Sequence, residues 1–238
     1  MKAIQTGPIG ANTWIVPLAE NFVFIVDPAG RSVTGDETAI TDYLESHSLN
    51  PVAVILTHGH FDHVIGLPVI KEKYPKIKIA IHKDDSEYIG KNSQIVQEKC
   101  LAPLGATGFI PYLSNLPEAD FFLEDSCSLE KYFTADYCTK ICGGNSELGE
   151  KVCSAFGNWL VLHTPGHTTG SVCLYNQKEK MLISGDTIFF RSQGRTDLYG
   201  GSDADMAKSL AKIKKIVLPD TLVFPGHDYS GFCLSENL

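Results

Sequence analysis

The chain has 238 residues, of which 43% are hydrophobic and 20% are charged, as in an ordinary globular protein. Its formal net charge of −8 disfavours a nucleic-acid partner, because binding to nucleic acid depends on lysine and arginine that neutralise phosphates. No segment is apolar for long enough to span a bilayer, and the N-terminal residues lack the apolar core of a secretory signal. We therefore expect a cytoplasmic protein with no nucleic-acid or membrane partner.

The first predicted elements are strands. Residues 12–16 and 22–26 are apolar and β-prone, and a polar turn separates them. Thr34 and Glu37 have the spacing of a capping box, so a helix is predicted after them, and Pro51 is expected to end it. The all-apolar run 52–56 then predicts a strand that is buried on both faces.

Helices and strands continue to alternate beyond this run. Helices are predicted at 65–74 and 84–92, with a strand at 77–81 between them. Further strands are predicted at 159–162, 172–175, 181–184 and 221–224, and a helix at 204–217 precedes the last of them. This alternation predicts one α/β domain over 1–238, in which helices cover mixed sheets.

The segment 93–151 has no regular hydrophobic period and contains many glycine, proline and serine residues. We interpret it as a cysteine-rich insertion or lid. Seven cysteines, an odd number, are expected to be free thiols rather than a disulfide framework. A metal site made of Cys127, Cys138, Cys142 and Cys153 is an alternative, but these residues lack the paired spacing of a zinc signature.

Histidine and aspartate residues follow four of the predicted strands. THGHFDH follows the strand at 52–56, HTPGH follows 159–162, SGDT follows 181–184 and PGHD follows 221–224. If these strands share a sheet edge, the loops after them converge on one cleft. The side chains that would meet there are His58, His60, Asp62, His63, His167, Asp186 and His227.

Imidazole nitrogens and carboxylate oxygens bind Zn²⁺, and they also suit iron or manganese. Seven such groups exceed the four that a tetrahedral zinc takes, so two metals are expected. His47 is interpreted as an ordinary surface or core residue, and His82 and His163 as supporting or structural residues. Three histidines within residues 58–63, in a chain that has eight in all, are not explained by packing alone.

In this order, THGHFDH, HTPGHTTGSV, SGDTIF and FPGHD resemble the ligand motifs of the metallo-β-lactamase superfamily. The resemblance covers nearly the whole chain and implies a four-layer αββα sandwich with a dinuclear site at one edge. It implies that Asp186 bridges two metals, the first held by His58, His60 and His167 and the second by Asp62, His63 and His227. Aspartate at 186, where the best-known secreted β-lactamases carry cysteine, argues against antibiotic hydrolysis.

Such a site predicts hydrolysis, because zinc lowers the pKa of bound water to about 7 and so supplies hydroxide. Asp62 is the expected catalytic residue, which would orient the nucleophile and accept its proton. FFRSQGRTDLYGGSDADM resembles the corresponding segment of hydroxyacylglutathione hydrolases (glyoxalase II), which implies that Arg195 binds an anionic substrate. We therefore predict a glyoxalase II-like thioesterase with two Zn²⁺ per chain, a small anionic thioester as substrate, and Arg195 and Tyr199 as substrate-binding residues.

Other readings stay open at this point. Arg195 could simply pair with Asp197, and Tyr199 could pack against its neighbours. GRTDLY and PGHDYSGF resemble persulfide dioxygenases of the same superfamily, in which a single iron would lie at His58, His167 and Asp186. A lactonase and a nuclease are further alternatives, and the net negative charge disfavours the nuclease.

Overall fold

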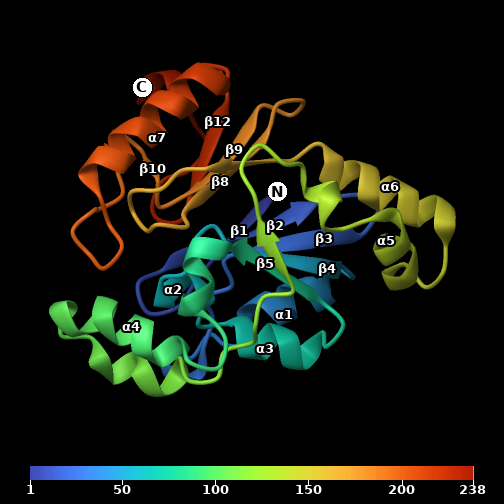
Figure 1. Cartoon of the computed structure of the whole chain (residues 1–238). Helices are drawn as coiled ribbons and strands as arrows, with labels where there is room; N and C mark the ends of the chain where they lie inside the picture. Colours follow the sequence, from blue (N-terminus) through green and yellow to red (C-terminus); the bar gives the residue numbers. More distant parts are fainter. Residues whose placement is uncertain (238) are drawn as a thin grey trace.

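Residues 1–237 are described by a computed structural model, and its N-terminal part forms a six-stranded sheet (Figure 1). The strand order is β1-β2-β3-β4-β5-β6, with β1 (Lys2–Thr6), β2 (Ala11–Pro17), β3 (Phe22–Val26), β4 (Asn50–Ile55), β5 (Lys78–His82) and β6 (Phe121–Leu123). The first three strands are antiparallel neighbours, whereas β3 to β6 run parallel to one another. The predicted strands at 22–26 and 52–56 are thus central strands of this sheet.

A second sheet has five strands in the order β13-β12-β9-β8-β7. They are β7 (Leu160–His163), β8 (Val172–Asn176), β9 (Met181–Gly185), β12 (Leu222–Pro225) and β13 (Phe232–Cys233). β8 is antiparallel to both β7 and β9, and β9 is parallel to β12. The C-terminal ends of β7, β9 and β12 therefore lie at the same edge of this sheet. A short hairpin of β10 (Ile188–Phe189) and β11 (Ser192–Gln193) follows β9.

Helices connect the strands. The α-helices are α1 (Ala39–Ser46), α2 (Phe61–Val64), α3 (Leu67–Lys73), α4 (Ser93–Leu101), α5 (Ala135–Ile141), α6 (Ser146–Gly157) and α7 (Asp203–Ile216). Short 3₁₀ helices are η1 (Ser32–Thr34), η2 (Lys83–Tyr88), η3 (Ala102–Leu104), η4 (Thr107–Tyr112), η5 (Leu129–Lys131) and η6 (Leu234–Glu236). No helix within residues 1–237 has the length and apolar character needed to cross a bilayer.

Three hydrophobic clusters define the layers. The cluster between the two sheets includes Phe24 of β3 and Val161 of β7. Ile25, on the opposite face of β3, belongs to a second cluster with Ile70 of α3. A third cluster packs Ile213 of α7 against the outer face of the second sheet. The fold is the predicted αββα sandwich (Figure 1).

The start and end of α1 were predicted wrongly. Thr34 lies in η1, where its hydroxyl donates to the carbonyl of Arg31, so it does not cap α1. The helix begins after Thr38 and ends at Ser46. Pro51 lies within β4, beside an irregularity in the β3–β4 register, where the lack of a backbone N–H is tolerated.

Two other predicted helices differ from the structure. The helix predicted at 65–74 is the shorter α3, since α2 ends at Val64, before the predicted range begins. The helix predicted at 84–92 is the shorter 3₁₀ helix η2. The segment 93–151 contains regular elements, among them α4, β6 and α5. It also contacts the first sheet, because β6 pairs with β5 and the Tyr137 hydroxyl of α5 donates to the Val52 carbonyl of β4 at 2.6 Å. That this segment acts as a lid stays a prediction. All seven cysteines are free thiols, as expected.

Replacement of Phe24 by alanine should destabilise the fold strongly. Phe24 is fully buried, and its ring centroid lies 5.7 Å from that of Phe156 and 5.5 Å from that of Trp159. We expect the free energy of unfolding in urea to fall by about 3–5 kcal/mol, because the cavity cannot close fully. Phe122→Ala is the control, since 47% of that side chain is exposed, and should cost less than about 1 kcal/mol. Equal losses would contradict this assignment of the core.

Candidate metal centre

The seven predicted residues converge where the two sheets meet, although their strands belong to different sheets. β4 lies in the first sheet, whereas β7, β9 and β12 lie in the second, so there is no single shared sheet edge. Backbone hydrogen bonds join the two sides, from Val172 N to Thr57 O at 2.8 Å and from Asn12 N to Gly226 O at 2.6 Å. The face-to-face packing of the sheets therefore brings the loops together.

His58, His60 and His167 form one cluster. One donor atom from each lies within 4.8 Å of the others, and His60 Nδ1 is 2.8 Å from His167 Nε2. His58 Nε2 is buried and has no hydrogen-bond partner among residues 1–237. A buried nitrogen without a partner costs about 1–3 kcal/mol, so this cluster fits a bound cation better than a packed core. Three imidazoles are also a ligand set found in catalytic zinc sites.

Asp62, His63 and His227 form a second cluster of the same kind. His227 Nε2 lies 3.0 Å from Asp62 Oδ2 and 3.1 Å from His63 Nε2. Asp186 lies between the clusters, because its Oδ1 is 3.4 Å from His63 Nε2 and its Oδ2 is 3.5 Å from His167 Nε2. Asp186 Oδ1 is buried and accepts no hydrogen bond within the described part of the chain. Histidine and aspartate clusters of this type are typical of dinuclear sites.

The backbone must come very close to this centre at Gly226, directly before His227. A Cβ atom at position 226 would lie 2.2 Å from Asp186 Oδ1 and 2.6 Å from His63 Cε1. Any other residue would displace one of these side chains, so glycine is required here by the close approach.

The two clusters differ in charge. Burial, followed by the neighbouring histidines, holds the pKa of both His58 and His60 well below the ordinary value. Burial alone would lower the pKa of His63, but Asp62 and Asp186 raise it well above that value. Burial alone would raise the pKa of Asp62, but His63 and His227 lower it well below its usual range. The first cluster therefore offers neutral imidazoles, and the second offers a carboxylate.

Asp27 was missed as a site residue by sequence reasoning, and it orients one histidine in each cluster. Its Oδ2 accepts from His63 Nδ1 at 3.0 Å and from the Thr57 hydroxyl at 2.6 Å. Since that hydroxyl proton is given to Asp27, Thr57 Oγ1 accepts from His58 Nδ1 at 3.1 Å. Nε2 is then the nitrogen of both His58 and His63 that would bind a metal. The available signal was that Asp27 directly follows a buried strand, as the predicted ligands do.

Asp85 was also missed, and it connects the loop after β4 to the loop after β7. It is fully buried and accepts from Gly59 N at 2.8 Å, Gly170 N at 2.6 Å and the Thr168 hydroxyl at 2.7 Å. Burial raises the pKa of Asp85, and these three hydrogen bonds act against that rise. Because Gly59 and Thr168 are neighbours of His58, His60 and His167, Asp85 fixes the spacing of the first cluster.

Arg195 lies at the site but is paired locally. Its guanidinium donates to both Asp197 oxygens, with Nε 2.7 Å and Nη2 2.9 Å away, and its backbone carbonyl accepts from His167 Nδ1 at 2.8 Å. Tyr199 is 45% exposed and lies beside Lys99, whose Nζ is 4.4 Å from the ring centroid. Contacts of Arg195 and Tyr199 with a substrate stay predictions.

His82 and His163 lie outside the two clusters. Their rings stack with centroids 3.9 Å apart, and His163 Nε2 donates to Thr169 O at 2.9 Å. Together with Asp84 they form a separate, more exposed group that could hold a metal, so the supporting roles expected for them stay predictions.

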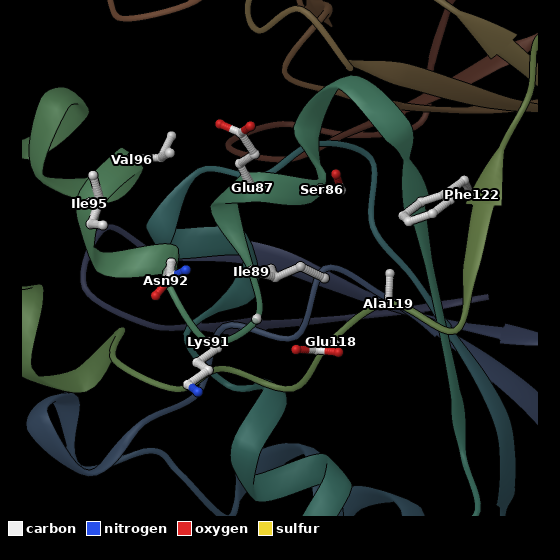
Figure 2. A pocket seen from close by; sticks show the side chains of 11 residues that line it. Ser86, Glu87, Ile89, Lys91, Asn92, Ile95, Val96, Glu118, Ala119 and Phe122 are labelled. Atoms are coloured by element: carbon white, nitrogen blue, oxygen red, sulfur yellow. The ribbon is translucent and has the colours of Figure 1, made fainter.

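A cavity of about 100 Å³ opens directly onto the centre and is lined by His60, Asp62, His167, Asp186 and Arg195, among others. A larger cavity of about 430 Å³ lies on another side of α4, where Ile95, Val96 and Phe122 contribute to its wall (Figure 2). None of the seven predicted ligands lines the larger cavity. Four of the seven predicted ligands line the smaller cavity instead.

Known proteins are similar to this chain in sequence and in fold. The metallo-beta-lactamase superfamily model matches residues 6–127 and 154–227, which include all seven predicted ligands. A probable metallo-hydrolase of Bacillus subtilis, YqgX, is 29% identical across 99% of this chain and 93% of that protein. A hydroxyacylglutathione hydrolase of Bdellovibrio bacteriovorus is 28% identical across 91% of this chain and 67% of its own length. The crystal structure of BLEG-1 B3 metallo-beta-lactamase matches with a TM-score of 0.75 and 26% identity, over 99% of this chain and 94% of that one.

The family match, the sandwich fold and the position of the histidine and aspartate clusters agree. The matched residues make up far more than half of the chain. The chain belongs to the metallo-beta-lactamase superfamily.

Proposed function

We propose that the protein is a thioester hydrolase that binds two divalent metals at the seven clustered residues. The observation that carries this proposal is the pair of clusters on either side of Asp186, with buried and unpartnered donor atoms at His58 Nε2 and Asp186 Oδ1 among residues 1–237. The hydroxyacylglutathione hydrolase relatives support a thioester as the substrate class.

In this proposal His58, His60 and His167 hold one metal, Asp62, His63 and His227 hold the other, and Asp186 contributes to both. The donors are imidazoles and carboxylates without a thiolate, which suits zinc. A bound zinc would lower the pKa of water towards about 7 and polarise the carbonyl of the substrate.

The role of the chain is then to position water and to move one proton. Asp62 lines the small cavity, and its lowered pKa keeps it as a carboxylate near neutral pH. It can accept the proton of the water whose oxygen adds to the thioester carbonyl carbon. When the C–S bond breaks, the sulfur leaves with the electron pair and takes that proton from Asp62, which gives a carboxylic acid and a thiol and restores the carboxylate.

We also propose that Arg195 and Tyr199 contact an anionic group of the substrate. A carboxylate can bind the guanidinium in the same bidentate way that Asp197 does, and so can replace it. Both residues of this ion pair are substantially exposed, with about half of the Arg195 side chain in solvent, so the exchange needs no change in the core.

Elemental analysis of protein purified without added metal, combined with two activity assays, tests the proposal. We expect two zinc ions per chain and turnover of thioesters, because two complete donor sets are present. One iron per chain, with oxygen consumed on glutathione persulfide and no thioester turnover, would instead establish the dioxygenase alternative.

Asp186→Ala should lower the metal content and abolish thioester turnover while the fold is retained. Asp186 touches both clusters, and its loss removes a ligand from each. Metal content by mass spectrometry and far-ultraviolet circular dichroism are the measurements. His47→Ala is the control, since His47 lies at the exposed end of α1. Unchanged metal content in Asp186→Ala would remove this residue from the ligand set.

Asp27→Asn should weaken the binding of both metals by about 10–100-fold without unfolding the chain. An amide nitrogen placed next to His63 Nδ1 would favour the tautomer that carries its proton on Nε2, which then cannot bind a metal. Asparagine also tolerates the backbone φ of +54° at this position.

Titration with a competing zinc chelator measures this change in affinity. Asp36→Asn is the matched control, because Asp36 is likewise a carboxylate that accepts backbone N–H groups, from Gly7 and Arg31, but it does not contact a proposed ligand. Equal affinities in Asp27→Asn and Asp36→Asn would show that Asp27 does not orient the ligands.

A further inference from the structure

One wall of the small cavity is apolar. Its side chains are Ile9 of the β1–β2 turn, Phe61 of α2, Cys100 and Leu101 of α4, Leu104 of η3 and Leu198 of the loop before α7. Two of them are unusually exposed for large aliphatic residues, Ile9 at 61% and Leu104 at 44%. Exposed aliphatic side chains at the rim of a cavity with chemical groups at its base are typical of a ligand site.

The polar groups of this cavity already have other roles. His60, Asp62, His167 and Asp186 belong to the proposed metal sites, and the guanidinium of Arg195 is paired with Asp197. The remaining polar atom is the thiol of Cys100. Burial raises the pKa of Cys100 to about 11, so the thiol is neutral at pH 7 and behaves as a small apolar group.

We infer that this cavity binds the acyl part of the substrate and selects short, unsubstituted aliphatic acyl groups. The inference rests on the proposed thioester hydrolysis and adds to it the identity of the acyl group. With the carbonyl at the metal ligands, the carbon chain extends along Leu101 and Leu104 towards Ile9. The anionic group proposed to contact Arg195 and Tyr199 then belongs to the thiol side of the molecule.

The size and polarity of the cavity set the limits of this selectivity. The cavity is small, with a volume of about 100 Å³, so only a short acyl group fits in it. Each buried methylene should raise kcat/KM about fourfold, which corresponds to about 0.8 kcal/mol. A 2-hydroxyl group would lie against apolar side chains without a partner, and should lower kcat/KM at least about fivefold.

Thioesters of N-acetylcysteamine test the proposed acyl selectivity directly. The acyl groups to compare on this thiol are acetyl, propionyl, butyryl, hexanoyl and 2-hydroxypropionyl. We expect kcat/KM to rise about fourfold per methylene up to butyryl and to stop rising at hexanoyl, and propionyl to exceed 2-hydroxypropionyl. Equal values across the series, or a preference for the hydroxylated group, would overturn the inference and leave thioester hydrolysis standing.

Binding of the free acids by the metal-loaded protein gives a second readout, independent of turnover. Calorimetry should show that butyrate binds about 15-fold more tightly than acetate, because two more methylenes are buried. If no thioester is hydrolysed but butyrate is still preferred, the proposed reaction fails and the apolar acyl site stands. Equal binding of both acids would overturn the acyl site.

The variant Leu104→Ala tests whether the preference for longer acyl groups arises in this cavity. Leu104 is exposed, so its truncation should not unfold the chain, and the butyryl-to-acetyl ratio of kcat/KM should fall at least about threefold. Ile95→Ala is the matched control, because Ile95 is 56% exposed on α4 and lines the larger cavity instead (Figure 2). A fall in the ratio for both variants, or for neither, would contradict the assignment.

Discussion

The carboxylate of Asp27 is the constraint on which the metal centre depends most. It is buried at the end of β3 and holds His63 directly and His58 through Thr57. Because His58 and His63 belong to different clusters, one carboxylate determines which nitrogen of a proposed ligand in each cluster would bind a metal. Asp85 complements it by fixing the spacing between the loops after β4 and β7. The centre is thus oriented before any ligand arrives, so little reorganisation is needed when a metal binds.

This preorganisation has a cost in the folded chain. Imidazole nitrogens of His60 and His167 face one another at 2.8 Å, and His58 Nε2 is buried without a partner within the described residues. Buried nitrogens without a partner in the described residues, such as Nε2 of His58 and Nε2 of His60, are unfavourable without a cation. Metal binding would relieve them and stabilise the native state by mass action. The sandwich fold holds these unfavourable polar groups in place, as is typical of a functional site.

Much of the architecture could be predicted from sequence, because apolar runs such as 22–26 and 52–56 fix the central strands and the histidines and aspartates follow strand ends directly. Asp85 could not be found in this way, because its partner Gly170 is 85 positions away and only the packing of the two sheets brings them together. Local signals were weakest where tertiary contacts override them. Thr34 has the spacing of a capping box but lies in η1, and Pro51 lies inside a strand at a register irregularity.

Anomalous diffraction from crystals of the protein, measured at the zinc and iron absorption edges, tests the central claim most directly. The account predicts two zinc peaks, one among His58, His60 and His167 and the other among Asp62, His63 and His227, with Asp186 between them. A single peak, an iron signal alone, or a metal bound at His82, Asp84 and His163 with the two clusters empty would contradict it.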